Sequence, residues 1–125
     1  MEITDYILII LKLIVGISIL NVWLVQPNKA TKWRGGNAKT IVEEFEVYGL
    51  SKTFCYVIGF LKVSLSLLLL ASIWFESLTG YASSGLALLL LGSIIMHIKI
   101  KDPMYKSVPA TLFLLMNIAI ALLAA

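Results

Sequence analysis

The chain has 125 residues, of which 60% are hydrophobic and 14% charged, and its formal net charge is +3. Soluble domains have roughly half apolar and about a quarter charged residues, so this composition excludes an ordinary water-soluble domain. The basic residues lie in connections beside apolar segments rather than along a folded groove, so we expect no nucleic-acid partner. A single cysteine, Cys55, excludes an internal disulfide and a Cys-x-x-Cys redox pair.

Four apolar stretches account for most of the chain, and each is close to the ~20 residues with which a helix crosses ~30 Å of hydrocarbon. They run over about 3–25, 54–74, 81–98 and 108–125. The sequence therefore predicts an all-α membrane protein, one domain over 1–125 that forms an antiparallel bundle of four transmembrane helices. Because the start is acidic where a signal peptide would be basic, we expect the first helix to be retained.

The connection between the first two spans is long and contains a predicted amphipathic segment at 40–49. Thr40 and Glu43 have the spacing of a capping box, and Gly49 is placed as a helix stop. At 100° per residue the apolar side chains share one face, while Glu44 falls at its edge. The segment either lies on the membrane interface or is tucked under the bundle with Glu44 directed inward.

Basic residues in the connections predict the orientation, since Lys and Arg are retained on the cytoplasmic side. The N-terminal tail, the second connection and the C-terminus contain none. We therefore expect a protein of the cytoplasmic membrane with both termini outside the cytoplasm. The first and third connections contain Lys29, Lys32, Arg34, Lys39, Lys52, Lys99, Lys101 and Lys106.

Two lysines lie within the predicted spans, where ionisable groups are candidates for function. Lys12 and Lys62 each follow the start of their helix by ~12 Å, at ~1.5 Å per residue, and so enter from opposite faces of the membrane; both are expected near the middle at similar depth. The aliphatic part of a lysine side chain can instead lie in lipid, with its ammonium at the interface. For Lys12 both interpretations remain open.

The neighbours of Lys62 favour an interior position. Cys55, Gly59, Lys62 and Ser66 form one stripe of small and polar residues, which is typical of a packed helix face. A buried ammonium needs a partner, and Glu44 is the one carboxylate at the edge of an inward face. The sequence predicts a Glu44 to Lys62 ion pair and a polar cavity around it.

The last two spans add further polar and small residues. His97 follows Ser93 by one turn and is expected to form hydrogen bonds near the interface, since no His or Cys partners suggest a metal site. Asn117 is expected to join helices through a hydrogen bond, and Gly85 and Gly92 to form a close-packing seam. The predicted cavity residues are Lys62, Glu44, His97, Asn117 and Ser66.

The order of several short motifs resembles the DoxX-like family of small four-helix membrane proteins. The motifs are Tyr48-Gly49-Leu50-Ser51, then Ile58-Gly59-Phe60-Leu61-Lys62-Val63, then His97 before a basic loop that ends at Asp102-Pro103. The resemblance covers nearly the whole chain. DoxX proteins proper often have an acidic residue near the position of Lys62, so this chain is more similar to the DoxX-like branch.

The resemblance implies two kinds of function. The family is named after a subunit of a thiosulfate:quinone oxidoreductase, and a eukaryotic branch includes an assembly chaperone for nicotinic receptors. The chain is therefore expected to be either a non-catalytic accessory bundle that binds a small amphiphile, such as a quinone or a lipid, or an assembly factor without a ligand. Its partner would be another membrane protein or a second copy of the chain.

Two other classes fit less well. A sterol-isomerase type of enzyme uses buried carboxylates, which the predicted spans lack, so no catalytic residues are assigned. A small multidrug transporter needs a membrane-embedded glutamate in the first helix, where this chain has Lys12. A cationic site would repel the cations that such transporters carry.

The predicted orientation can be tested by labelling single cysteines after Cys55 is replaced. A cysteine at Ser77 should react with an impermeant thiol reagent from outside intact cells, because the second connection is expected there. A cysteine at Asn37 should react only after lysis. The reverse pattern would overturn the orientation.

Overall fold

The computed structural model describes residues 2–125. Its long helices are α1 (Ile3–Leu20), α3 (Lys52–Ala71), α4 (Thr79–Lys99) and α5 (Val108–Ala124). The shorter helical segments are η1 (Asn21–Val25), α2 (Ile41–Val47), η2 (Glu76–Leu78) and η3 (Met104–Ser107). The described chain contains no strand, and four helical segments are long and apolar enough to cross a membrane. The predicted all-α membrane fold is confirmed.

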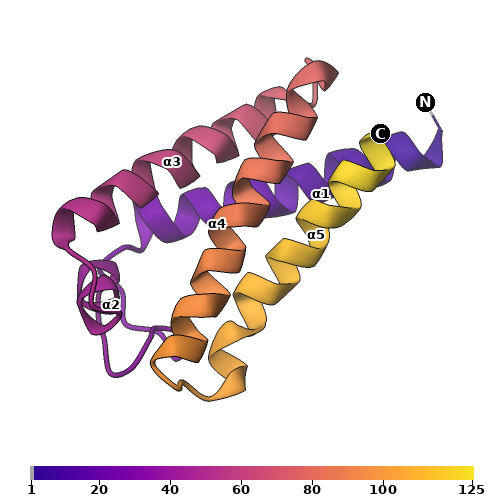
Figure 1. The fold of residues 1–125 in the computed structure, drawn as a ribbon. Helices are drawn as coiled ribbons and strands as arrows, with labels where there is room; N and C mark the ends of the chain where they lie inside the picture. The colour runs from indigo at the N-terminus through magenta and orange to yellow at the C-terminus, as the bar shows by residue number, and fades with distance from the viewer. Residues whose placement is uncertain (1) are drawn as a thin grey trace.

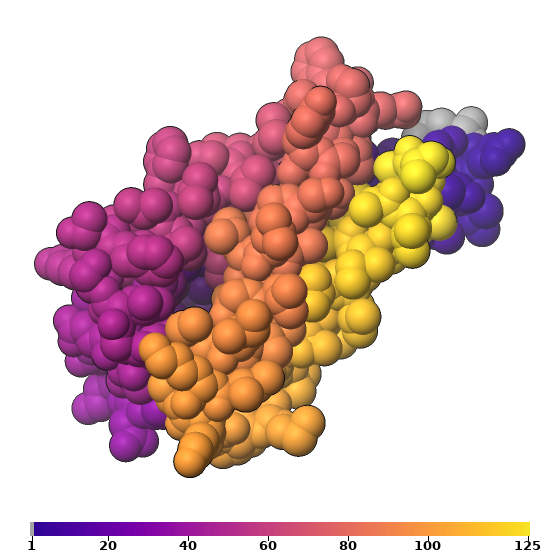
Figure 2. All heavy atoms as spheres, viewed as in Figure 1, coloured from indigo at the N-terminus to yellow at the C-terminus, as the bar shows by residue number. Residues whose placement is uncertain are grey.

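The four long helices form a closed ring of neighbours. α1 packs against α3 and α5, and α4 packs against α3 and α5. Both termini lie at one end of the bundle and α2 lies at the other (Figure 1). α3 and α4 are close where their short connection joins them and diverge toward the α2 end, and the surface is hollowed between them (Figure 2).

Local capping explains where α2 and α3 begin and end. Thr40 accepts a hydrogen bond from the Glu43 N–H to start α2, and Ser51 accepts one from the Phe54 N–H to start α3. Between them Gly49 has φ +84°, the left-handed conformation that glycine adopts without strain. The α3 helix therefore occupies Lys52–Ala71, slightly earlier than the predicted 54–74.

The short helix α2 packs against the first turns of α3. Ile41 and Phe45 are buried and contact Cys55, and the Phe45 ring meets the Trp23 ring edge to face with centroids 5.9 Å apart. Tyr48, just after the helix, is 4% exposed. These contacts place the apolar side of α2 against the first turns of α3 and the Trp23 ring.

The central core is a layer of fully buried apolar side chains contributed by all four long helices. It contains Val15, Leu69, Leu86 and Ile120, each 0% exposed. Close packing in lipid depends on side-chain fit, because lipid tails are as apolar as the helices themselves. The core side chains are therefore held in place by close van der Waals packing rather than by exclusion of water.

Two of the three predicted packing glycines lie against another helix. A Cβ added to Gly59 would lie 2.6 Å from the Trp23 ring, and one added to Gly85 would lie 2.8 Å from the Leu65 side chain. A Cβ on Gly92 would meet nothing within 4 Å. The predicted seam is therefore wrong at Gly92, because α4 diverges from α3 toward the α2 end of the bundle (Figure 1).

Lys12 lies inside the bundle, and its depth differs from that of Lys62. Its ammonium donates to the Ser72 carbonyl and to the Thr79 hydroxyl, both at 3.0 Å. Because Ser72 follows Lys62 by ten residues, ~15 Å along α3 separates the two sites. The expectation of similar depth was wrong, since each stem reaches toward a different end of the bundle.

Replacing Gly59 tests the contact with Trp23. Gly59→Ala should lower the melting temperature in detergent, because overpacking of this kind costs ~1–3 kcal/mol. Gly92→Ala is the matched control and should be neutral or stabilising, since alanine is the better helix former by ~1 kcal/mol. Equal melting temperatures for the two variants would contradict the packing.

Candidate functional site

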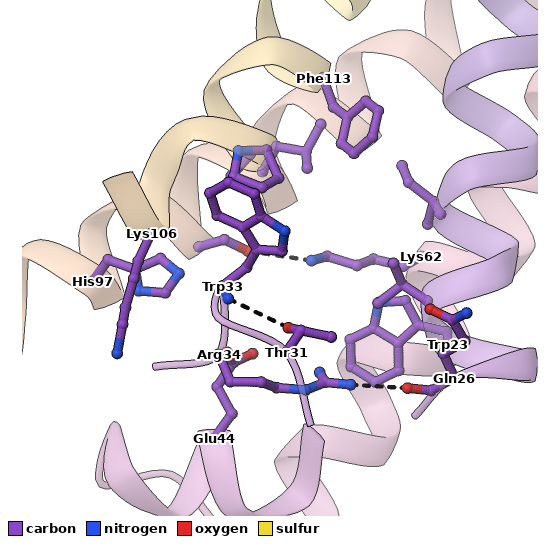
Figure 3. Close-up of a pocket in the computed structure, with 16 residues that line it drawn as sticks. Trp23, Gln26, Thr31, Trp33, Arg34, Glu44, Lys62, His97, Lys106 and Phe113 are labelled. Carbon is purple, nitrogen blue, oxygen red and sulfur yellow. Dashed lines mark hydrogen bonds between the residues drawn. The ribbon is translucent and has the colours of Figure 1, made fainter. Parts of the chain in front are cut away.

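A cavity of about 300 Å³ lies toward the α2 end of the bundle. All four long helices contribute to it, and the long first connection forms its floor (Figure 3). The apolar lining includes Trp23, Leu90 and Phe113. The polar and charged lining consists of Gln26, Thr31, Arg34, Glu44, Lys62, Ser93, His97 and Lys106.

Lys62 extends from α3 into this cavity (Figure 3). It is 9% exposed, and its ammonium donates to the Ser93 hydroxyl at 3.2 Å. The Trp23 ring centroid lies 5.6 Å from the ammonium, within the range of a cation–π interaction. An ammonium has three N–H donors, so the contacts within the described chain leave donor capacity for a further group.

The predicted ion pair between Glu44 and Lys62 is wrong. The Glu44 carboxylate instead accepts a hydrogen bond from the Gly35 N–H at 2.6 Å, and no salt bridge joins the two residues. The loop that precedes α2 folds back and supplies this nearer donor. Glu44 and Lys62 nevertheless line the same cavity.

His97 belongs to a hydrogen-bonded chain of three side chains. Its Nδ1 lies 2.7 Å from the Asp102 carboxylate and its Nε2 lies 3.4 Å from the Tyr48 hydroxyl. A carboxylate only accepts hydrogen bonds, so Nδ1 carries a proton, and in the neutral form of the ring the lone pair is at Nε2. The sequence analysis did not identify Tyr48 or Asp102 as site residues.

The end of α4 brings Asp102 back to His97. Lys101 has φ +58°, and the Asp102 N–H donates to the His97 carbonyl while the Lys101 N–H donates to the Ile98 carbonyl. This pair of bonds is a Schellman motif, which reverses the chain after a helix. The five-residue spacing from His97 to Asp102 at a helix end could have suggested the contact.

Asp102 also holds the floor of the cavity in place. Its carboxylate accepts from the Gly36 N–H at 3.0 Å and lies 3.7 Å from the Lys106 ammonium, which itself donates to the Gly36 carbonyl at 2.6 Å. Arg34 fixes the same loop by donating to the carbonyls of Gln26, Pro27 and Lys29. The first connection is thereby bound to the end of α4 and to η3.

The surroundings shift the pKa values of two groups in this network. Burial opposes ionisation of Asp102, but the hydrogen bonds from His97 and Gly36 and the charge of Lys106 outweigh it and lower the pKa of this carboxyl. Burial, followed by the nearby charges of Glu44 and Asp102, raises the pKa of the Tyr48 hydroxyl. Tyr48 is therefore neutral and Asp102 is ionised near neutral pH.

Ser66 and Asn117 do not line the cavity, in contrast to the prediction. Both are 0% exposed, and the Asn117 amide donates to the Phe113 carbonyl of its own helix at 2.8 Å. The Ser66 hydroxyl and the Asn117 Oδ1 have no hydrogen-bond partner within the described chain. The expectation that Asn117 joins two helices by its amide was wrong, because the i−4 carbonyl is closer.

The sequence model of the DoxX-like family matches residues 32–121, which is more than half of the chain. The chain belongs to the DoxX-like family. No curated protein and no solved structure matches it. The matched segment contains Lys62, Glu44, His97 and Asp102 but not η1, which supplies Trp23 to the cavity of this DoxX-like protein.

Replacement of Asp102 tests its role as the anchor of the loop. Asp102→Asn should destabilise the protein by ~1.5–3 kcal/mol at neutral pH, the usual value of hydrogen bonds to a charged group. Because the pKa is lowered from its ordinary 3.8, this stabilisation is present above about pH 4 and is lost as pH falls through the folded-state pKa. Thermal unfolding in detergent over a pH series measures both effects.

Glu46→Gln is the control, since Glu46 lies on the exposed side of α2. It should melt like the parent, and the acid sensitivity of the parent should be reduced only in Asp102→Asn. An Asp102→Asn variant as stable as the parent at neutral pH would contradict the proposed anchor.

Proposed function

We propose that this DoxX-like protein is a non-catalytic accessory bundle that binds the quinone-like head group of a small amphiphile and associates with a membrane redox complex. The observation that carries the proposal is the Lys62 ammonium, which faces a cavity with an apolar wall and has one hydrogen-bond partner within the described chain. A carbonyl oxygen can accept from its remaining N–H groups. Electron transfer would belong to the partner complex.

The size and lining of the cavity support this ligand class. Its volume of about 300 Å³ suits a single substituted ring, at the lower limit of ordinary small-molecule sites. Trp23, Leu90 and Phe113 provide apolar surface for the ring. Lys62, Arg34 and Lys106 outnumber Glu44 in the lining, so the site favours electron-rich oxygens over cations.

Quenching of tryptophan fluorescence by a short-tailed benzoquinone tests the proposal. Trp23 and Trp33 line the cavity, whereas Trp74 is 76% exposed and lies outside it. Quenching should saturate in the parent. In Lys62→Met the affinity for the quinone should fall ~10-fold or more, because a hydrogen bond from a charged donor contributes ~1.5–3 kcal/mol.

Two controls separate specific binding from collisions in the detergent micelle. Lys12→Met removes a buried lysine at the other end of the bundle and should keep the affinity of the parent. A variant that retains only Trp74 should show unsaturable quenching. Equal affinities of the parent and Lys62→Met would exclude the proposed site.

A further inference from the structure

The contacts of His97 orient its ring so that Nε2 can accept a proton. The Asp102 carboxylate, 2.7 Å from Nδ1, orients the ring and would stabilise its protonated form. Asp102 stays ionised because the Gly36 N–H and Lys106 compensate its charge. The free lone pair of the ring is therefore at Nε2.

The Tyr48 hydroxyl, which faces Nε2, would compete only weakly with a ligand hydroxyl for this atom. The Tyr48 oxygen lies 3.4 Å away, beyond the ~2.7–3.2 Å of a well-formed hydrogen bond, and Tyr48 is bound to the fold through its own ring and backbone contacts. A ligand hydroxyl that approaches more closely would replace it. His97 itself lines the cavity, so its ring borders the space that a ligand would occupy.

Lys62, on α3, provides a cation that reaches across to α4. Its ammonium is bound to Ser93, and Ser93 precedes His97 by one turn of α4, so the two positions are ~5–6 Å apart at Cβ. Lys62 and His97 both line this cavity, so a cation and a proton acceptor border the same space.

We propose that the cavity takes an amphiphile whose head group carries an ionisable hydroxyl of the phenol class, and holds it as the oxyanion. The hydroxyl O–H bond breaks, the proton forms a bond to Nε2 of His97, and the electron pair stays on the oxygen, which Lys62 binds. The Nδ1 proton remains shared with Asp102, and the total charge of the complex does not change. This inference rests on the proposed function and specifies the class of ligand.

The charges around His97 are consistent with this transfer. Asp102 from the end of α4 and Glu44 from α2 are anions that favour an imidazolium, whereas Lys62, Lys106, Lys99 and Arg34 oppose it. Arg34 and Lys99 are bound to backbone carbonyls, and Lys106 to a carbonyl and Asp102. The oxyanion itself would offset the new charge on the ring.

The probe is 4-nitrophenol, whose anion is yellow, added to the full chain in detergent below the pKa of the probe. Bound probe should show the phenolate band while no proton is released to the buffer, as measured with a pH-indicator dye. Its methyl ether, 4-nitroanisole, has no proton to transfer and should bind more weakly. A bound probe that stays in its phenol form would overturn the inference.

Three variants locate the proton and the anion. Lys62→Met should lower the phenolate fraction ~10-fold or more, which corresponds to at least one unit in the pKa of the probe. His97→Gln should release about one proton to the buffer for each phenolate bound, since Gln cannot take it up. Lys12→Met should behave like the parent.

Tyr48→Phe keeps the test decisive if His97→Gln fails to fold. It removes only the competing hydroxyl and should tighten binding of the phenol but not of the ether. A parent that releases a full proton to the buffer, or a Tyr48→Phe variant with unchanged phenol affinity, would contradict the role of His97. If quinones bind at Lys62 while the phenol stays protonated, the inference fails and the proposed function stands; if neither binds, both fail.

Discussion

The carboxylate of Asp102 connects three segments that are distant in the sequence. It accepts hydrogen bonds from the His97 ring and the Gly36 N–H and lies beside Lys106. Without this carboxylate, the Gly36 N–H and the Lys106 ammonium would each lose a partner. Asp102 thereby joins the end of α4 to the loop that forms the floor of the cavity, which Arg34 and Glu44 also hold through backbone hydrogen bonds.

The two buried lysines show how a membrane protein accommodates charge inside its bundle. Lys12 donates to the carbonyl of Ser72, the C-cap of α3, where the negative end of the helix dipole favours a cation. Lys62 has the Ser93 hydroxyl and the Trp23 ring instead. The first lysine forms two hydrogen bonds to the α3–α4 connection, whereas the second has one hydrogen-bond partner within the described chain and faces the cavity.

The polar side of the cavity comes mostly from residues 32–121, the part of the chain that matches the family model. The apolar side takes Trp23 from the segment before it, and a Cβ at Gly59 would collide with that ring. Gly59 therefore allows α3 to approach Trp23 closely enough for Lys62 to reach over it. The packing of η1 against α3 and the position of Lys62 in the cavity are linked through this contact.

The sequence by itself determined the four spans, since ~20 apolar residues in a row have few alternatives to a membrane helix. It also indicated the capped start of α2 and the polar positions Lys62, Glu44 and His97, because local hydrogen bonds and helical periodicity depend on near neighbours only. Only the tertiary structure determined the hydrogen-bond partners of these three side chains. Glu44 binds Gly35, Lys62 binds Ser93 and His97 binds Asp102, because the folded loop and the splayed helices determine which donors and acceptors come within 3.2 Å of each other.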